Sequence, residues 1–500
     1  MDTFRNLAAE PAGLAQGISL VDATMIVIGS MVGTGIFVVS ADIARQVGSP
    51  GLLLLAWLIT GVLTVMGALC YGELAAVMPH AGGQYVFLRE AFGPLPSFLY
   101  GWAMFIVIQT GSIAAVAVAA AKFLGVLFPS ISESYVLLDL GVLPLTGRPL
   151  HLTTQNLVAV VSILAGTAIN ALGVRHGARV QTALTVLKTL TLLAIIVLGC
   201  ALLRDPSVFA ANFGPVWLGR PWSPVTVRLL GAAMVGSFFA ADAWNNVTFV
   251  AAEVRNPRRN LPIALAAGTG SVMLLYLLAN LAYLSVLPFD AIGHAPQDRV
   301  ASSAFGAMLG RAGQYVAAGA IIVSALGCNN GLILSGARIY YAMACDGLFF
   351  RTAARVNAHT RTPNVALAVQ AIWASVLALA GSYGQLLDYV MFTVLVFYVG
   401  TVAGVLVLRQ TQPDWDRPYK IIGYPIIPLV YMASVTLIAA VIFLEKPAGQ
   451  LGWRRLIDGD AGRGLVVVLL GIPVYWAWSR LGRRSAPELL ADAADRNVRV

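Results

Sequence analysis

The stretch GLLLLAWLITGVLTVMGALC, residues 51–70, contains no charged side chain. About 20 apolar residues are enough for a helix to cross the roughly 30 Å hydrocarbon core of a bilayer. Similar runs recur along the 500-residue chain, which is 58% hydrophobic and only 11% charged. Soluble domains are about a quarter charged, and a membrane β-barrel would show short alternating segments instead. The pattern therefore predicts a helical protein that crosses the membrane many times.

We expect twelve membrane spans, and the fold class is an all-α membrane protein with 12 transmembrane helices. The expected spans are 20–45, 51–77, 95–126, 153–172, 182–203, 226–251, 262–287, 313–344, 364–381, 385–408, 425–444 and 464–481. A short N-terminal segment (1–19) and a charged C-terminal tail (482–500) flank them.

The charge of the short loops predicts that both termini lie in the cytoplasm. Eleven Lys and Arg residues fall in loops 173–181, 252–262, 346–362 and 409–424. Only four fall in loops 127–152, 205–224, 288–312 and 382–384. Cytoplasmic loops carry such an excess of basic residues, which also accounts for the net charge of +9 without a nucleic-acid partner. Loop 445–463 is the exception, because it is assigned to the outside and contains four basic residues.

No pattern in the sequence indicates a cofactor, a metal centre or an enzyme active site. The four cysteines lie in or at the ends of apolar spans without a CxxC pair, and the five histidines lie in loops or at span ends. No phosphate-binding glycine loop follows any span, so ATP is not expected to drive the protein directly. The N-terminus lacks the features of a cleaved signal peptide, so the first span is expected to be retained.

The first span is interrupted by glycines in GSMVGTGIF, residues 29–37. Glycine destabilises a helix by about 1 kcal/mol relative to alanine, so the helix can break at Gly33-Thr34-Gly35. Free backbone groups at this depth are tolerated where they line a cavity or meet a ligand. Close packing between helices explains the same small residues, and both interpretations stay open.

Asp242 is the polar exception in the sixth span, within GSFFAADAWNNVTFVAAEVRNPRRNLP, residues 236–262. A carboxylate at the centre of a membrane helix costs about 2.5–3.5 kcal/mol and usually has a partner or a watery cavity. Transporters built from inverted repeats bind substrate where two corresponding helices are broken, and a zwitterionic amino acid suits both helix ends there. Because FAADAW contains no Gly or Pro, a structural carboxylate that caps a helix or bonds within the bundle is an equal alternative.

Lys188 lies nine residues beyond Arg179, or roughly 13 Å into the fifth span at about 1.5 Å per residue. Its long side chain can reach back to the cytoplasmic surface. The functional alternative is an ammonium fixed inside the bundle, in place of a bound cation or as a proton carrier. Glu73 lies near the cytoplasmic end of the second span. We expect it to form a structural ion pair in preference to a gating contact, and Arg338 is a possible partner.

Seven motifs in order resemble the L-type amino acid transporters of the amino acid–polyamine–organocation superfamily. They are GSMVGTGIF (29–37), CYGELAAVMPHAGGQY (70–85), VRHGARVQTALTVLK (174–188), FFAADAWNNVTFVAAEVRNPRRNLP (238–262), RIYYAMACDGLFF (338–350), PDWDRPYKIIGYPIIP (413–428) and LLGIPVYW (469–476). The resemblance implies a LeuT-like fold with 5+5 inverted repeats, spans 1–5 (20–203) and 6–10 (226–408), plus two C-terminal helices (425–481).

The resemblance also implies that spans 1 and 6 unwind around the substrate, which would bind between them. The backbone at Gly33, Thr34 and Gly35 would receive the substrate carboxylate. The backbone at Phe239 and Ala240 would accept from the α-ammonium, and the Phe239 ring would close over the substrate side chain.

Two further residues receive roles from the resemblance. Phe392 falls where the family places a pocket aromatic in the tenth span. Lys188 matches the fifth-span lysine of sodium-independent members, where its charge would bridge to span 1 at the position of a bound sodium ion.

The sequence departs from the animal members at Asp242, where those proteins usually carry glycine. Asp242 would line the pocket. There it would hydrogen-bond the free backbone of the unwound segment, attract a substrate ammonium, or narrow the pocket toward small substrates. Loop 127–152 contains no Cys, so a disulfide to a heavy chain cannot form there, and the protein is expected to work without one. The expected location is the plasma (inner) membrane.

The leading functional hypothesis is a sodium-independent exchanger of neutral L-amino acids that works by alternating access. A proton-coupled symporter, or a carrier of cationic amino acids or polyamines, is the close alternative, in which Asp242 pairs with the substrate or Lys188 loses its proton. A non-transporting amino acid sensor would carry a long soluble tail, whereas the tail here is short. A membrane enzyme is the weakest candidate, because no nucleophile–base pair or metal set is present in the sequence.

Overall fold

The computed structural model describes residue 14 and residues 16–142, 149–214, 221–380, 383–444 and 460–483. Most of the expected N-terminal segment, the tail beyond residue 483 and most of loop 445–463 lie outside the described residues. The described chain is helical apart from its loops and one antiparallel hairpin, in which Val136 of β1 (Val136–Val142) pairs with Thr153 of β2 (Pro149–Thr153).

The first ten described helices are α1 (Leu20–Met31), α2 (Gly35–Val47), α3 (Pro50–Val77), α4 (Gln84–Phe92), α5 (Pro94–Ala103), α6 (Gln109–Leu127), α7 (Thr154–Ala171), α8 (Val174–Val197), α9 (Pro206–Asn212) and α10 (Pro224–Ala240). The later helices are α11 (Asn246–Phe249), α12 (Pro257–Val286), α13 (Phe289–Gly293), α14 (Val300–Cys345), α15 (Asn364–Ala380), α16 (Tyr383–Thr411), α17 (Ile426–Leu444) and α19 (Asp460–Arg483). Short π-helical turns join α5 to α6 (Met104–Ile108) and end α8 (Leu198–Leu202), and 3₁₀ turns cover Ala251–Glu253, Pro296–Asp298 and Arg351–Ala354.

The expected membrane architecture is confirmed. Eight helices within the described ranges are long and apolar enough to cross a membrane, and the bent pair α1 and α2 makes one further span. Three shorter apolar helices lie at Pro224–Ala240, Asn364–Leu379 and Gly464–Arg480. Each of the twelve expected spans contains one of these elements, so the chain is an all-α, multi-pass membrane protein.

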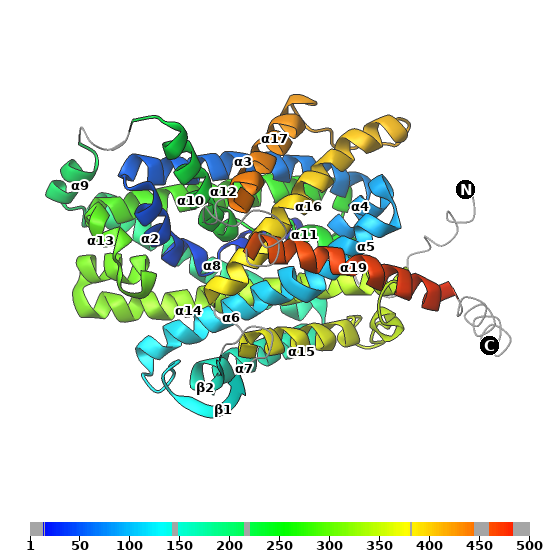
Figure 1. The fold of residues 1–500 in the computed structure, drawn as a ribbon, viewed down its shortest axis with the longest axis horizontal. Helices are drawn as coiled ribbons and strands as arrows, with labels where there is room; N and C mark the ends of the chain where they lie inside the picture. Colours follow the sequence, from blue (N-terminus) through cyan, green and yellow to red (C-terminus); the bar gives the residue numbers. More distant parts are fainter. Residues whose placement is uncertain are drawn as a thin grey trace.

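The long helices run side by side and place matching spans of the two expected repeats in contact (Figure 1). α2 packs on α10, α3 on α12 and α6 on α14, which are spans 1 and 6, 2 and 7, and 3 and 8. Two interlocked inverted repeats would produce this pairing. The repeat boundaries at 20–203 and 226–408 stay a prediction.

Polar residues mark the beginnings of several spans. The Ser19 hydroxyl accepts from the Asp22 N–H while the Asp22 carboxylate accepts from the Ser19 N–H, which is a capping box. Ser49 caps α3 and Ser223 caps α10, each followed by a proline in the first helical turn. Proline is favoured there because its missing N–H has no partner in a first turn.

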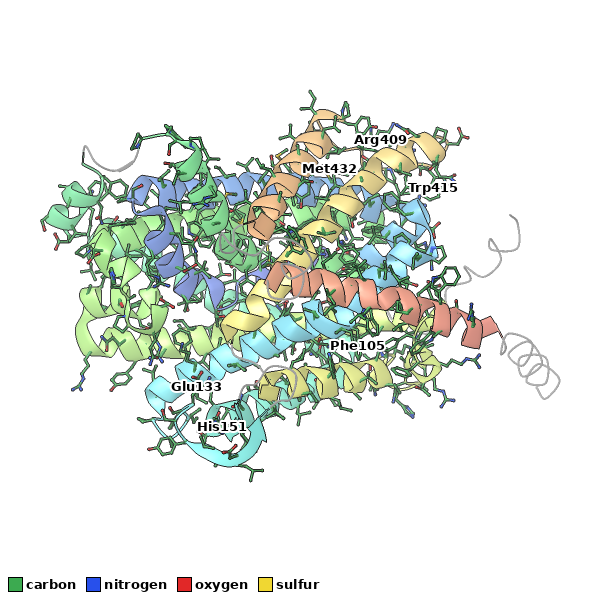
Figure 2. All side chains as sticks on the ribbon, in the orientation of Figure 1. Phe105, Glu133, His151, Arg409, Trp415 and Met432 are labelled. Carbon is green, nitrogen blue, oxygen red and sulfur yellow. The ribbon has the colours of Figure 1, made fainter. Side chains whose placement is uncertain are left out.

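Glu73 and Arg338 each form an ion pair with a residue of another element, but not with each other. Glu73 receives two hydrogen bonds from the Arg409 guanidinium, at 2.8 and 2.6 Å, and one from the Ile421 N–H. Arg409 lies near the end of α16, close to Trp415 (Figure 2). Arg338 instead pairs with Glu253 at 2.8 Å, and both side chains are fully buried. Glu73 is therefore in a structural ion pair, as expected, but Arg338 is not its partner, because α14 presents Arg338 to the turn after α11.

Candidate functional site

The first span is broken at the glycine pair. α1 ends at Met31, α2 begins at Gly35, and the two helix axes meet at a bend of 41°. A break leaves the last carbonyls of α1 and the first N–H groups of α2 without partners in their own helices. The expectation of a discontinuous first helix is confirmed.

The carbonyls at the end of α1 receive hydrogen bonds from side chains of three other spans. Lys188 Nζ of α8 donates to Gly29 O and, at 2.7 Å, to Val32 O. Further donors come from α12 and α14: Tyr276 Oη to Met31 O at 2.9 Å, Cys328 Sγ to Ser30 O at 3.0 Å, and Ser324 Oγ to Gly33 O at 3.1 Å. These side chains take the place of the N–H donors that a continuous helix would supply, and they thus stabilise the broken segment.

Lys188 has no solvent-exposed surface. A Cβ on Gly327 of α14 would approach Nζ to 3.3 Å, so the amine is also enclosed on the side away from α1. The alternative in which Lys188 reaches the cytoplasmic surface is therefore wrong. The bridge from the fifth span to the first that the resemblance implied is present.

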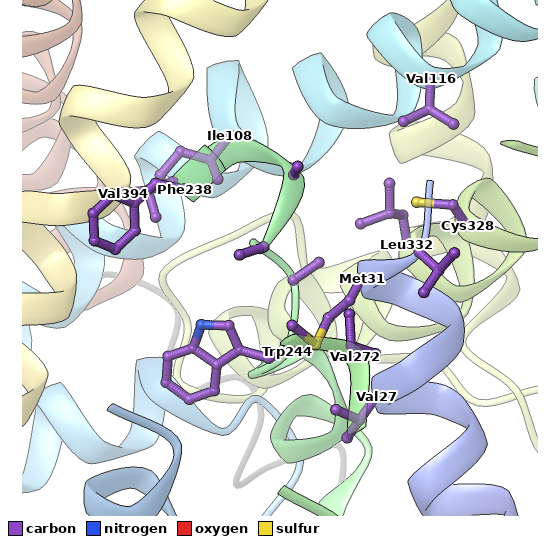
Figure 3. Close-up of a cluster of buried hydrophobic side chains, with 14 of the residues drawn as sticks. Val27, Met31, Ile108, Val116, Phe238, Trp244, Val272, Cys328, Leu332 and Val394 are labelled. Atoms are coloured by element: carbon purple, nitrogen blue, oxygen red, sulfur yellow. The ribbon is translucent and has the colours of Figure 1, made fainter. Parts of the chain in front are cut away.

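The sixth span is broken as well, although its sequence carries no helix-breaking residue there. α10 ends at Ala240, and the chain is non-helical until α11 begins at Asn246. Ala243 adopts a φ of 66°, which L-residues rarely adopt. Figure 3 shows this segment passing from Phe238 to Trp244, whose ring packs on Tyr71 with centroids 4.6 Å apart. The surrounding aromatic rings pack against the unwound segment. The local composition does not indicate this unwinding.

The two breaks touch each other at Gly35. A Cβ at this position would lie 2.7 Å from the Ala240 Cβ and 2.9 Å from its Cα. Contacts this short are not tolerated, so a side chain at position 35 would push α2 away from the end of α10. The glycine therefore serves both as a helix start and as a close-approach point.

A cavity lies between the two breaks. Its lining includes residues of both broken spans together with side chains of α6 and α14: Ser30, Met31, Gly33, Thr34, Gly35, Ser112, Val116, Phe239, Ala240, Asp242, Ala243, Cys328 and Leu332. Figure 3 shows Val116, Cys328 and Leu332 on one side of it. Six of the predicted substrate-binding residues, at positions 33–35, 239, 240 and 242, are brought together here.

A second cavity shares Ser112, Asp242, Ala243 and Leu332 with the first. Its remaining lining is mostly polar or aromatic and includes Gln84, Tyr100, Gln109, Asn245, Asn246 and Tyr398. Asp242 therefore stands at the boundary between two adjoining spaces. Its side chain is half-buried rather than sealed in the core.

The Asp242 carboxylate is held by α16 across the second cavity. Tyr398 Oη donates to Asp242 Oδ1 and lies 3.4 Å from Asn245 Oδ1. Asn245 Nδ2 in turn donates to Gln84 Oε1 at 2.8 Å, and Gln84 Nε2 donates to Thr401 Oγ1 at 2.9 Å. The unwound segment, α4 and α16 thus share one hydrogen-bond network that ends at the carboxylate.

Tyr398→Phe is expected to raise the KM for substrate about tenfold and to lower the free energy of unfolding by about 1–3 kcal/mol. The reason is that the carboxylate loses its hydroxyl donor, and a hydrogen bond to a charged group contributes about that much. Initial-rate transport and thermal unfolding measure the two effects. Tyr283→Phe is the control, because Tyr283 is buried and donates to Ile36 O at 3.5 Å, and neither residue lines either cavity. An unchanged KM in Tyr398→Phe would contradict the prediction.

The structure does not bring Phe392 to either described cavity, and its role in the pocket stays a prediction. Its ring packs on Phe443 of α17, with centroids 5.8 Å apart, and it lines neither described cavity. The cavity-facing side of α16 carries Val394 and Tyr398, which are one turn apart. Phe392 lies two residues before Val394, and residues so spaced do not face the same side of a helix.

Four side chains at the site were missed by sequence reasoning: Tyr276, Ser324, Cys328 and Tyr398. Each lies in an apolar span at least one helix away in sequence from the breaks, and single Ser, Cys or Tyr residues are common in such spans. Ser324 and Cys328 are one helical turn apart and thus share a face of α14. That spacing was the one local signal available.

Two broken spans that line one cavity define the class of membrane carriers in which substrate binds at helix discontinuities. The family described as amino acid permease matches residues 18–457. This chain therefore belongs to the amino acid permease family.

Individual relatives agree with this assignment. The chain is similar to b(0,+)-type amino acid transporter 1 of Rattus norvegicus, with 31% identity over 469 residues that cover 93% of this chain and 90% of the relative. It is similar to large neutral amino acids transporter small subunit 2 of Homo sapiens, with 30% identity over 93% of this chain and 80% of the relative. The resemblance to the L-type transporters is confirmed.

Proposed function

We propose that this amino acid permease is a sodium-independent exchanger of neutral L-amino acids that works by alternating access. The observation that carries the proposal is Lys188, whose Nζ donates to the carbonyls of Gly29 and Val32 at the first break. An ammonium supplies a fixed positive charge and three donors to these carbonyls. A cation from solution is then not required to hold the broken span.

The two breaks supply complementary partners for an amino acid. The beginning of α2, at Gly35 and its N-cap Thr34, lines the cavity, and the free N–H groups of a helix start suit a carboxylate. The carbonyl end of α10, at Phe239 and Ala240, suits an ammonium. Both ends line the same cavity, and the Phe239 side chain contributes to its wall. The substrate side chain would then extend along Asp242.

A second candidate, a carrier of cationic amino acids, is favoured by Asp242. One carboxylate oxygen accepts from Tyr398, and the half-buried side chain borders both cavities. A negative charge at this position would attract an ammonium or guanidinium on the substrate side chain. The relatives' names also point to both possibilities, since one is termed a b(0,+)-type and the other a large neutral amino acid transporter.

Uptake into proteoliposomes tests both candidates. Purified protein is reconstituted in sodium-free buffer, and labelled leucine, alanine and arginine are followed into vesicles that are empty or preloaded with unlabelled amino acid. We expect leucine and alanine to enter only preloaded vesicles. Preference for arginine would move the assignment to the cationic class, and accumulation in empty vesicles under an inward proton gradient would move it to symport. No uptake under any gradient would refute the proposed function.

We also place the protein in the plasma (inner) membrane with both termini in the cytoplasm, acting without a disulfide-linked heavy chain. All four cysteines are free thiols, and none of them lies between α6 and α7. Equal transport before and after treatment with a reductant would support this part of the proposal.

A further inference from the structure

A short segment, residues 296–299, connects two of the helices that line the first cavity. It follows α13, which packs on α2 (Figure 1). Arg45, near the end of α2, donates to Asp298 Oδ1 at 2.6 Å. The next residue, Arg299, places its guanidinium over the Phe123 ring of α6, 5.5 Å from the ring centroid. The segment therefore reaches from the end of α2 to the end of α6.

Phe123 lies on the same face of α6 as two residues of the cavity wall. Ser112 and Val116 line the first cavity, and Phe123 follows Val116 by seven residues, a spacing that keeps all three on one side of the helix. Seven residues correspond to roughly 10 Å along α6 at about 1.5 Å per residue. α6 ends at Leu127, in a loop that we place on the outside of the membrane. Arg299 is therefore on the outer side of the cavity.

The Arg299 guanidinium is free to bind a ligand. The side chain is half-buried, and its Nε atom and the Ser302 hydroxyl one helical turn further on have no hydrogen-bond partner among the described residues. No carboxylate in the described part of the chain pairs with Arg299, whereas Arg45 is held by Asp298. A ligand at Arg299 thus displaces water and breaks no hydrogen bond among these residues. Guanidinium groups bind carboxylates through two parallel hydrogen bonds.

We propose that Arg299 forms an outer binding site for the carboxylate of an amino acid on its way to the cavity. The Phe123 ring holds the guanidinium by a cation–π contact, and the carboxylate then moves on to the helix start at Gly35. This inference rests on the proposed function, including the placement of both termini in the cytoplasm. A group that contacts the substrate only on the way speeds entry and exit equally. The site therefore raises the rate of uptake from outside without changing the affinity of the cavity.

Arg299→Gln is expected to lower kcat/KM for external leucine about tenfold, the factor that one hydrogen bond to a charged group supplies. Uptake is measured in cells that express the variant and lack a leucine carrier of their own. The equilibrium Kd of the purified variant for leucine should stay within about twofold of the parent value. A structural role of Arg299 would instead weaken this Kd or lower the thermal stability together with uptake, and that result would overturn the proposal. An unchanged kcat/KM would overturn it as well.

Arg311→Gln is the matched control, because Arg311 is exposed on the same helix and the substitution removes the same charge. It should leave kcat/KM unchanged, and an equal loss in both variants would show a general effect of charge. Arg299→Lys keeps the positive charge and should retain at least about a third of the parent kcat/KM. If Arg299→Gln does not fold, Phe123→Leu provides the test. Loss of the cation–π contact should lower kcat/KM about threefold with the same Kd, and an unchanged kcat/KM there would contradict the proposal.

A competing carboxylate distinguishes the substrate from a resident anion. Succinate replaces chloride outside the cells at constant ionic strength. We expect it to raise the KM of the parent protein for leucine and to leave the KM of Arg299→Gln unchanged. An unchanged parent KM would assign Arg299 to an anion from solution and overturn its role in substrate entry. If the parent protein takes up no leucine in either medium, the proposed function fails instead, so the two failures are distinguishable.

Discussion

Replacement of Lys188 by alanine is expected to lower the initial rate of amino acid exchange at least about a hundredfold. Gly29 O loses its side-chain donor and Val32 O keeps only Ser324 Oγ, at 3.2 Å. Each buried carbonyl left without a partner costs about 1–3 kcal/mol, and a factor of one hundred in rate corresponds to about 2.7 kcal/mol. The end of α1 should then lose the geometry that presents the first N–H groups of α2 to the cavity. Exchange in proteoliposomes and thermal unfolding of the purified variant measure the two effects.

Lys122→Ala provides the comparison, because Lys122 lies near the end of α6 and is only partly buried. It should retain at least half of the parent rate. Lys188→Met fills nearly the same volume without donors and should behave like the alanine variant. If Lys188→Met transported normally, the Lys188 side chain would contribute only by packing, and its hydrogen bonds would not matter for transport. The sodium-independent assignment would then lose its support.

Gly35→Ala is expected to reduce exchange by a similar factor, although it adds a single methyl group. The new Cβ would lie 2.7 Å from the Ala240 Cβ and 2.9 Å from the backbone Cα, so the backbone must shift rather than a flexible side chain. Overpacking of this kind typically costs about 1–3 kcal/mol, and here it moves the two groups that would hold the substrate's charged ends. Transport rate and substrate-induced thermal stabilisation should both fall.

Gly270→Ala is a matched control for that substitution. Gly270 lies inside α12, and a Cβ there would meet no atom within 4 Å. Alanine at an unobstructed helix position is favoured over glycine by up to about 1 kcal/mol, so this variant should be at least as stable as the parent and fully active. Equal activity of both alanine variants would show that the approach of α2 to α10 does not matter for transport.

The two breaks differ in how far they could be predicted. The first coincides with Gly33 and Gly35, whose low helix propensity is a local signal. The second falls within residues 241–245, where alanine and tryptophan favour or tolerate a helix. Tertiary packing overrides propensity there, since Trp244 is buried and contacts the Tyr71 and Tyr398 rings. From the residues alone it was therefore undecided whether the helix breaks at Asp242. Only the family resemblance implied a break there.

Long-range partners were the least predictable part of the site. Lys188 could be identified as unusual because a charged residue in an apolar span is rare, and its position was then implied by the family motif. Tyr276 and Ser324 gave no such signal, because their hydroxyls become informative only when α12 and α14 are placed beside the broken helix. Phe392 is the opposite case, because it is an aromatic in the expected span whose ring packs against Phe443 of another helix.

The cation at the first break belongs to the polypeptide, and this has a consequence for cell energetics. A carrier that takes its stabilising charge from solution gains one ion's electrochemical gradient in every cycle and can drive its substrate uphill. Here the charge belongs to Lys188 of α8, which does not cross the membrane with the substrate. Transport is therefore not coupled to an ion gradient through that charge. On the proposed cycle, the work available to import one amino acid comes from the concentration ratio of the amino acid that leaves. Such a protein would redistribute existing amino acid pools across the membrane, and a different, ion-driven carrier would have to fill them.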